Sequence, residues 1–121
     1  MQNLYEATIT EIGTDVPFII EENVVIFFDE KAPKELHDVA VVHKNGALLS
    51  DIAAGDTFLY NETRYRVIFV GDTANATIRD LGHYTLNFTG DTSETLPGSI
   101  YVEKADVPEL KAGTVFRFVR E

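Results

Sequence analysis

The chain has 121 residues, a formal net charge of −10 and no cysteine. Hydrophobic residues make up 45% and charged residues 25% of it, which is ordinary for a globular protein and disfavours disordered, collagen-like and coiled-coil classes. Its acidity argues against a nucleic-acid partner, and no apolar stretch approaches the roughly 18 residues of a membrane span. We therefore expect one cytoplasmic domain over residues 1–121.

Alternation of apolar and polar residues with a period of two dominates the sequence and predicts strands. The alternation is clearest in residues 5–12, where Tyr5, Ala7 and Ile9 share one face. The further predicted strands are residues 24–28, 39–42, 57–60, 64–70, 84–88, 99–102 and 114–119. Short helices are predicted at residues 33–38 and 73–81, the second ending at Gly82 as its cap.

Seven or eight short strands with one or two short helices predict an all-β fold. We favour a small closed or partly open β-barrel, because closure removes exposed strand edges. Residues 52–58 resemble residues 110–116, at a spacing of 58 that is close to half the chain. The other similar pairs of segments are 5–13 with 65–71 and 24–28 with 84–88. Two pseudo-symmetric half-barrels would explain this weak repeat.

His43 is the first candidate for chemistry, in a chain that lacks cysteine and a P-loop. It comes between the predicted strand 39–42 and the turn formed by Lys44, Asn45 and Gly46. We expect this strand end to lift the imidazole out of the sheet toward solvent while the scaffold behind it stays rigid. A histidine held in this way is suited to catalysis.

The two other histidines have simpler interpretations. His83 lies between Gly82 and the strand 84–88, and it is predicted either as a second functional group or as a partly buried ring bonded to a backbone carbonyl. His37 is expected to be solvated on a helical turn. No two histidines have the spacing of paired metal ligands on one element, so neither a metal site nor a cofactor is predicted.

Short features in a fixed order along the chain carry a resemblance to a known family. They are the segment 5–13 with Thr8-Ile9-Thr10, the histidine followed by Gly46, the Gly55 turn, Val70-Gly71, Leu81-Gly82-His83 and Pro97-Gly98. With these features the chain resembles the glucitol/sorbitol-specific IIA component of the bacterial phosphoenolpyruvate-dependent phosphotransferase system.

The resemblance implies a phosphotransferase component that serves sugar-alcohol uptake and meets the membrane only through its permease. It implies that His43 accepts a phosphoryl group from phospho-HPr and passes it to the IIB component. Some members of the family have a second histidine where this chain has Asn45, so the resemblance gives that position no role.

We expect Nε2 of His43 to attack phosphorus while a backbone carbonyl or a carboxylate holds Nδ1–H. The groups predicted to bind the phosphoryl group are the backbone N–H groups of Lys44, Asn45 and Gly46, the Lys44 ammonium, and His83 as a stabilising neighbour. We also expect the excess negative charge to lie away from His43.

Four apolar residues near His43 are predicted either to form its docking surface or to belong to the core: Val41, Val42, Leu48 and Leu49. The main alternative function is a non-catalytic β-barrel module that binds a small polar ligand or a regulatory protein, with His43 as a recognition residue. A metal-dependent enzyme of barrel type is a more distant third.

Overall fold

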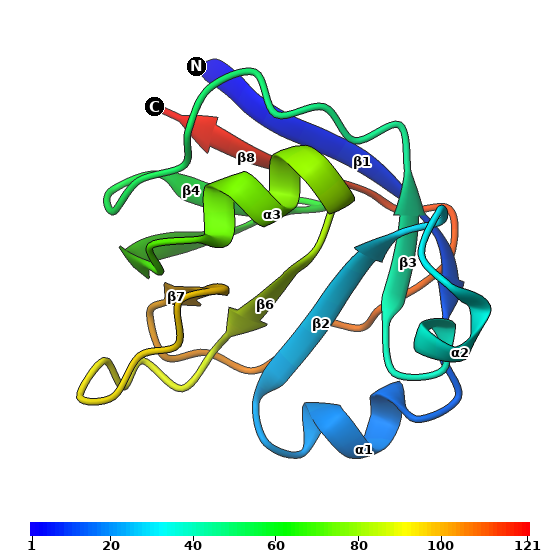
Figure 1. Cartoon of the computed structure of the whole chain (residues 1–121). Helices are drawn as coiled ribbons and strands as arrows, with labels where there is room; N and C mark the ends of the chain where they lie inside the picture. The colour runs from blue at the N-terminus through cyan, green and yellow to red at the C-terminus, as the bar shows by residue number, and fades with distance from the viewer.

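The computed structural model describes residues 1–121 and shows eight strands closed into a barrel, with three short helices outside them (Figure 1). The strands are β1 (Gln2–Ile12), β2 (Val24–Asp29), β3 (Val41–Lys44), β4 (Thr57–Tyr60), β5 (Thr63–Val70), β6 (Tyr84–Asn87), β7 (Ser99–Val102) and β8 (Val115–Arg120). Their order around the barrel is β1-β3-β2-β6-β7-β5-β4-β8. The predicted all-β barrel is thus confirmed, and it is closed.

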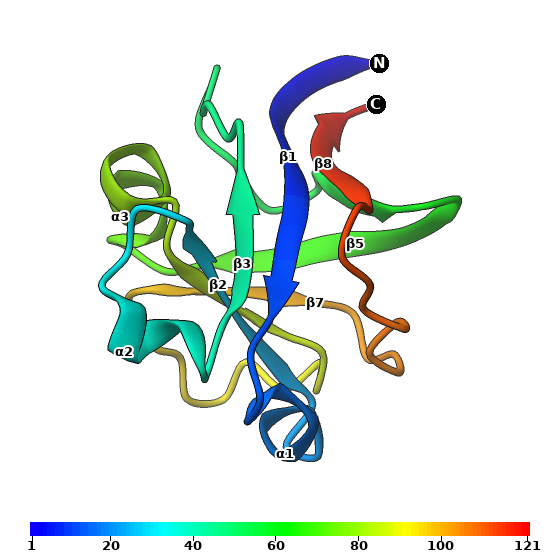
Figure 2. The same ribbon diagram turned by 90° about the vertical axis from the view of Figure 1, so that its right-hand side faces the viewer.

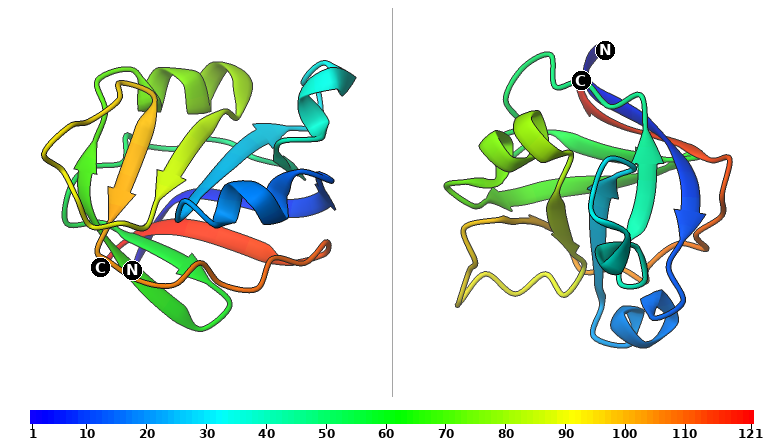
Figure 3. Two further views of the ribbon diagram at one scale, coloured as in Figure 1. Left: turned by 90° about the horizontal axis from the view of Figure 1, so that it is seen from below. Right: turned by 45° about the vertical axis from the view of Figure 1, so that its right-hand side comes forward.

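The helices are α1 (Val16–Ile20), α2 (Lys34–His37) and α3 (Ala74–Leu81). The sequence predicted α2 and α3 but not α1, whose five apolar residues lack a side-chain cap at Asp15. Helix α1 packs against β2 and α3 against β6, so α3 lies apart from the other two helices (Figure 3). No helix has the length and apolar character needed to cross a membrane.

The barrel has an internal twofold relation that exchanges β1 with β5, β2 with β6, β3 with β7 and β4 with β8. Under this exchange the strand order is unchanged, and the two parallel pairs, β2–β3 and β6–β7, replace each other. Both halves carry the same bulge, between Ile9 and Glu11 in β1 and between Val67 and Phe69 in β5. The strand order and register thus agree with the predicted pseudo-symmetric halves, and the predicted spacing of 58 holds for β1 with β5, whereas β3 and β7 are related by 59.

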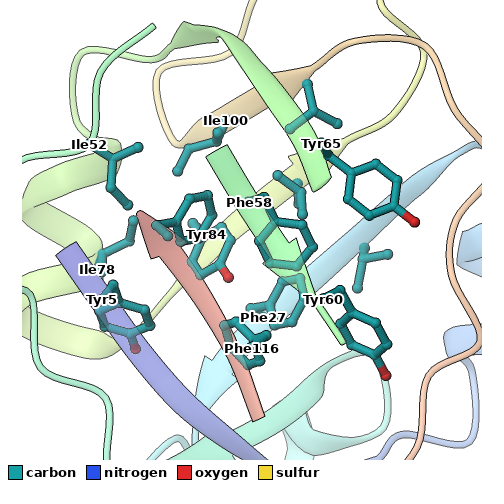
Figure 4. Packing of buried hydrophobic residues seen from close by; sticks show 14 of the residues in the cluster. Tyr5, Phe27, Ile52, Phe58, Tyr60, Tyr65, Ile78, Tyr84, Ile100 and Phe116 are labelled. Atoms are coloured by element: carbon teal, nitrogen blue, oxygen red, sulfur yellow. The ribbon is translucent and has the colours of Figure 1, made fainter. Parts of the chain in front are cut away.

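Aromatic rings fill the barrel interior (Figure 4). Phe27 stacks on Tyr84 with ring centroids 4.8 Å apart, and Phe116 packs 5.0 Å from Phe27 and 5.9 Å from Phe58. All four side chains are fully buried, and burying each such ring contributes about 2 to 3 kcal/mol. A closed, aromatic core therefore holds the strands that carry the candidate site.

The Tyr84 hydroxyl is buried in this core and has no hydrogen-bond partner. We expect Tyr84→Phe to leave the free energy of unfolding unchanged or to raise it by up to about 1 kcal/mol, because an unpaired buried hydroxyl is costly. Chemical denaturation measures the effect. Tyr60→Phe is the matched control: its hydroxyl donates to Glu109 O at 2.9 Å and accepts from Lys111 N–H at 3.2 Å, so that variant should be less stable. A loss from Tyr84→Phe as large as the control's would contradict the assignment.

Candidate functional site

His43 lies inside β3, not beyond its end. Strand β3 is paired on both edges, with His43 opposite Ile9 of β1 and opposite Asp29 of β2, as the position of β3 between these strands shows (Figure 2). These partners continue the strand to Lys44, and alternation then points His43 inward like Val41. The imidazole is 0% exposed, so the expectation that it is lifted toward solvent is wrong.

Three aromatic rings surround the imidazole. The ring centroid of Phe116 lies 5.5 Å from that of His43, that of Tyr5 lies 6.1 Å away, and that of Phe27 lies 6.2 Å away. Burial lowers the pKa of His43 to about 4, although the hydrogen bond to Gly82 and the charge of Asp29 act in the opposite direction. The ring is therefore neutral at cellular pH and keeps a nucleophilic lone pair.

One hydrogen bond fixes the tautomer of this neutral ring. Nε2 of His43 lies 3.0 Å from the carbonyl oxygen of Gly82, and because a carbonyl can only accept, Nε2 carries the proton. Nδ1 is buried without a partner and holds the lone pair. We expected Nδ1–H to be the bonded group, so this expectation is wrong: the only carbonyl in reach faces the other nitrogen.

A cleft of about 400 Å³ is lined by Gly82 and Asp29, two neighbours of the imidazole, although His43 itself does not line it. Gly82, Gly46 and Asp29, the cross-strand neighbour of His43, belong to its wall. The remaining lining residues are Phe28, Lys31, Ala32, Pro33, Ile78, Arg79, Asp80 and Leu81. The cleft thus combines two cations, two carboxylates and several apolar side chains.

Gly82 separates this cleft from the ring and must be glycine in this geometry. It ends α3 in the left-handed conformation with φ +62°, as its position after residues 73–81 predicted. A Cβ on Gly82 would lie 2.8 Å from Cβ of Asp29 and 3.1 Å from Cε1 of His43. The glycine therefore allows the helix end to lie directly against the imidazole.

The second half of the barrel shows what is special about this contact. Under the twofold, Gly82 corresponds to Asn23, whose carbonyl accepts the backbone N–H of Phe88 at 2.8 Å. His43 corresponds to Val102, because Val102 pairs with Val67 as His43 pairs with Ile9. Of these two equivalent contacts between the halves, only that of His43 with Gly82 therefore joins an imidazole to the carbonyl that follows a helix.

His83 lies on the outer face of the barrel wall. Its ring stacks on Phe28 with centroids 4.2 Å apart, and its Nδ1–H donates to Phe27 O at 3.1 Å. This is the partly buried, carbonyl-bonded ring that was one of the two interpretations, and His83 does not line the cleft. His37 is also more enclosed than expected, with hydrogen bonds to Glu11 Oε1 and Ala32 O.

The predicted turn after His43 reaches the cleft at one residue. Gly46 lines it, and a Cβ there would collide with the Tyr5 hydroxyl. Lys44 and Asn45 are exposed and do not line the cleft, and Asn45 has φ +64°. Of the predicted phosphoryl-binding groups, the structure brings only Gly46 to the cleft beside His43.

The charge and apolar residues around the site differ in part from expectation. Asp29 and Asp80 line the cleft, so negative charge is not kept away from His43, although Lys31 and Arg79 balance it there. Val41 and Val42 are buried and Leu48 packs against the core, whereas Leu49 is 66% exposed. No group of three or more histidine or acidic side chains is arranged to hold a metal ion.

Comparisons with known proteins agree with this barrel. The family model described as the PTS system glucitol/sorbitol-specific IIA component matches residues 4–117. This chain belongs to that family. The glucitol/sorbitol-specific EIIA components of Shigella flexneri and Escherichia coli K12 are each 32% identical to it over 118 residues, which are 98% of this chain and 96% of theirs.

A solved structure is similar to this IIA component over most of its length. The crystal structure of a PTS system IIA component from Enterococcus faecalis V583 superimposes with a TM-score of 0.81 at 26% identity. The match covers 94% of this chain and 98% of that one. The resemblance stated from the sequence is thereby confirmed.

Proposed function

We propose that this protein is the phosphoryl carrier of a glucitol/sorbitol phosphotransferase permease, with His43 as the residue that is phosphorylated. It would accept the group from phospho-HPr in the cytoplasm and transfer it to the IIB component. The observation that carries the proposal is the neutral, oriented imidazole beside a cleft, in a member of a phosphotransferase family. Burial keeps this ring from binding a second proton, so once Nε2 gives up the proton that it donates to Gly82 O, Nε2 has the lone pair that attacks phosphorus.

We place the phosphoryl group on Nε2, since this nitrogen faces the Gly82 peptide in the cleft wall. In the balanced exchange, Nε2 loses its proton and forms an N–P bond while the P–N bond of the donor breaks. The donor imidazole leaves with a proton in place of the phosphoryl group. Nδ1 has a lone pair before and after the exchange, which suits its apolar surroundings without a partner.

Because the imidazole is fully buried, transfer requires the Gly82 carbonyl to move away from Nε2. A docked partner would supply this opening and exclude water from the reacting groups. The exposed apolar residues at the cleft, such as Leu81 with 52% exposure, suit a transient protein contact. His83, on the outer face, is the weaker part of the proposed site.

The proposal is tested by incubating the protein with phosphoenolpyruvate, enzyme I and HPr and measuring its intact mass. We expect one acid-labile phosphoryl group on the wild type and on the control His37→Gln, and none on His43→Gln. The nitrogen–phosphorus coupling in NMR spectra should place the group on Nε2. The variant His83→Ala should accept the phosphoryl group more slowly than the wild type only if His83 contacts that group.

Two results would refute the proposal: no phosphoryl group on the wild type, or a group that persists in His43→Gln. Absence of any adduct would instead favour the non-catalytic module. Phosphorylation at Nδ1 would leave the carrier role intact and would refute the proposed movement of Gly82.

A further inference from the structure

Two cationic side chains that the sequence did not single out line the cleft beside Gly82. Lys31 comes from the turn after β2, and Arg79 comes from the last turn of α3. Together they balance Asp29 and Asp80 in the same cleft, in a chain whose net charge is −10. The cleft therefore repels an anion less than the protein as a whole does.

Arg79 has a partner that an anion can replace. Its Nη2 donates to Oδ1 of Asp51 at 2.6 Å, but the two side chains are 53% and 67% exposed. Exposed ion pairs are weak, because water screens them and both side chains lose freedom. A phosphoryl group offers two or more oxygens and nearly twice the charge to a planar guanidinium, and should bind it more strongly than Asp51 does.

Lys31 is positioned differently. Its backbone N–H donates to Oδ2 of Asp29 at 3.0 Å, and this bond fixes the turn next to the cross-strand neighbour of His43. The Lys31 ammonium takes part in none of the protein's salt bridges. It can turn toward an anion in the cleft without breaking an existing pair.

We propose that Arg79 and Lys31 bind the phosphoryl group on His43, and that Asp51 holds Arg79 at the cleft until the group arrives. This inference rests on the proposed function, and it names the cations of that same site. Transfer of a phosphoryl group depends on stabilising charge on its equatorial oxygens. Both cations line the cleft that the Gly82 peptide separates from the imidazole, so the movement of Gly82 that transfer requires would bring the phosphoryl group to them.

The test compares Arg79→Gln and Lys31→Gln with two matched controls. Arg64 and Lys111 are exposed and paired with Glu121 and Glu109, and neither lines the cleft. The measurement is the equilibrium between phospho-HPr and the phosphorylated protein, followed by intact mass. Loss of a charge-assisted hydrogen bond should shift this equilibrium about tenfold toward phospho-HPr in either cleft variant, whereas Arg64→Gln and Lys111→Gln should match the wild type.

Asp51→Asn separates phosphoryl binding from a structural role for the salt bridge. If Asp51 competes for Arg79, its removal should shift the same equilibrium about twofold toward the phosphorylated protein. If the Arg79–Asp51 salt bridge only stabilised the fold, Arg79→Gln and Asp51→Asn would shift the equilibrium in the same direction. Arg79→Lys should recover part of the loss, since it keeps the charge but not the planar fork.

The inference would be overturned, and His43 would remain the carrier, if Arg79→Gln and Lys31→Gln both showed the same phosphoryl-transfer equilibrium as the wild type. Parallel shifts in Arg79→Gln and Asp51→Asn would also overturn it. An unphosphorylated wild type would refute the proposed function and this inference with it. Arg79→Gln and Lys31→Gln change side chains at the surface of the cleft, and denaturant unfolding checks that the folded state is kept.

Discussion

Gly82→Ala is expected to lower the free energy of unfolding by about 2 to 4 kcal/mol. Part of the loss comes from a Cβ at φ +62°, and the rest from crowding, because that Cβ would lie 2.8 Å from Cβ of Asp29 and 3.1 Å from Cε1 of His43. Asp29 sits on β2 and His43 on β3, so neither backbone moves easily. Urea denaturation of the two proteins gives the difference.

Gly113→Ala is the matched control for this prediction. Gly113 also has a positive φ, +91°, but a Cβ there would meet no atom within 4 Å. Its substitution therefore measures the backbone cost alone, at a dihedral angle at least as unfavourable for alanine. We expect Gly82→Ala to be the more damaging variant and to slow phosphoryl acceptance as well, whereas equal losses in stability would show that the contact with the imidazole is not tight.

The barrel and its repeat could be predicted because both depend on local patterns. Alternating or continuous apolar runs marked all eight strands. Gly13 and Gly71 mark equivalent bends, where their N–H groups bond to Ala40 O and Ser99 O. The exact correspondence of residues between the two halves could be predicted less well. The sequence comparison of residues 24–28 with residues 84–88 assumed that equivalent residues in β2 and β6 are 60 positions apart. In the structure Phe27 pairs with Val41 as Leu86 pairs with Ile100. Phe27 therefore corresponds to Leu86, and the true separation is 59.

The surroundings of His43 could not be predicted, because they depend on contacts between distant segments. Nothing in the turn that follows His43 shows that β1 pairs beyond it, to Lys44, and that β2 reaches it at Asp29, so that the side chain is enclosed. The carbonyl that fixes its tautomer belongs to Gly82, 39 positions later, and Arg79 reaches the cleft only because α3 packs beside β6. Sequence patterns made the histidine a candidate, whereas tertiary packing determines its protonation and its access.

Burial of His43 should make the protein lose stability in acid in a specific way. Its pKa is 6.5 in the unfolded chain and about 4 in the folded protein. Between these values the unfolded state binds more protons, so the free energy of unfolding rises with pH. The contribution of His43 to the free energy of unfolding is fully present above pH 6.5 and decreases as pH falls toward 4. The loss from this residue alone is up to about 3 kcal/mol.

The measurement is the free energy of unfolding at several pH values for the wild type and His43→Gln. Both proteins share all 20 acidic residues, so their carboxylate titrations cancel in the difference and the His43 contribution remains. His37→Gln keeps the buried ring and should therefore keep the full acid loss. If His43→Gln lost stability as steeply as the wild type between pH 6.5 and 4, the folded protein would tolerate a charged imidazole in the barrel. The neutral nucleophile on which the proposed phosphoryl transfer depends would then have no basis in burial.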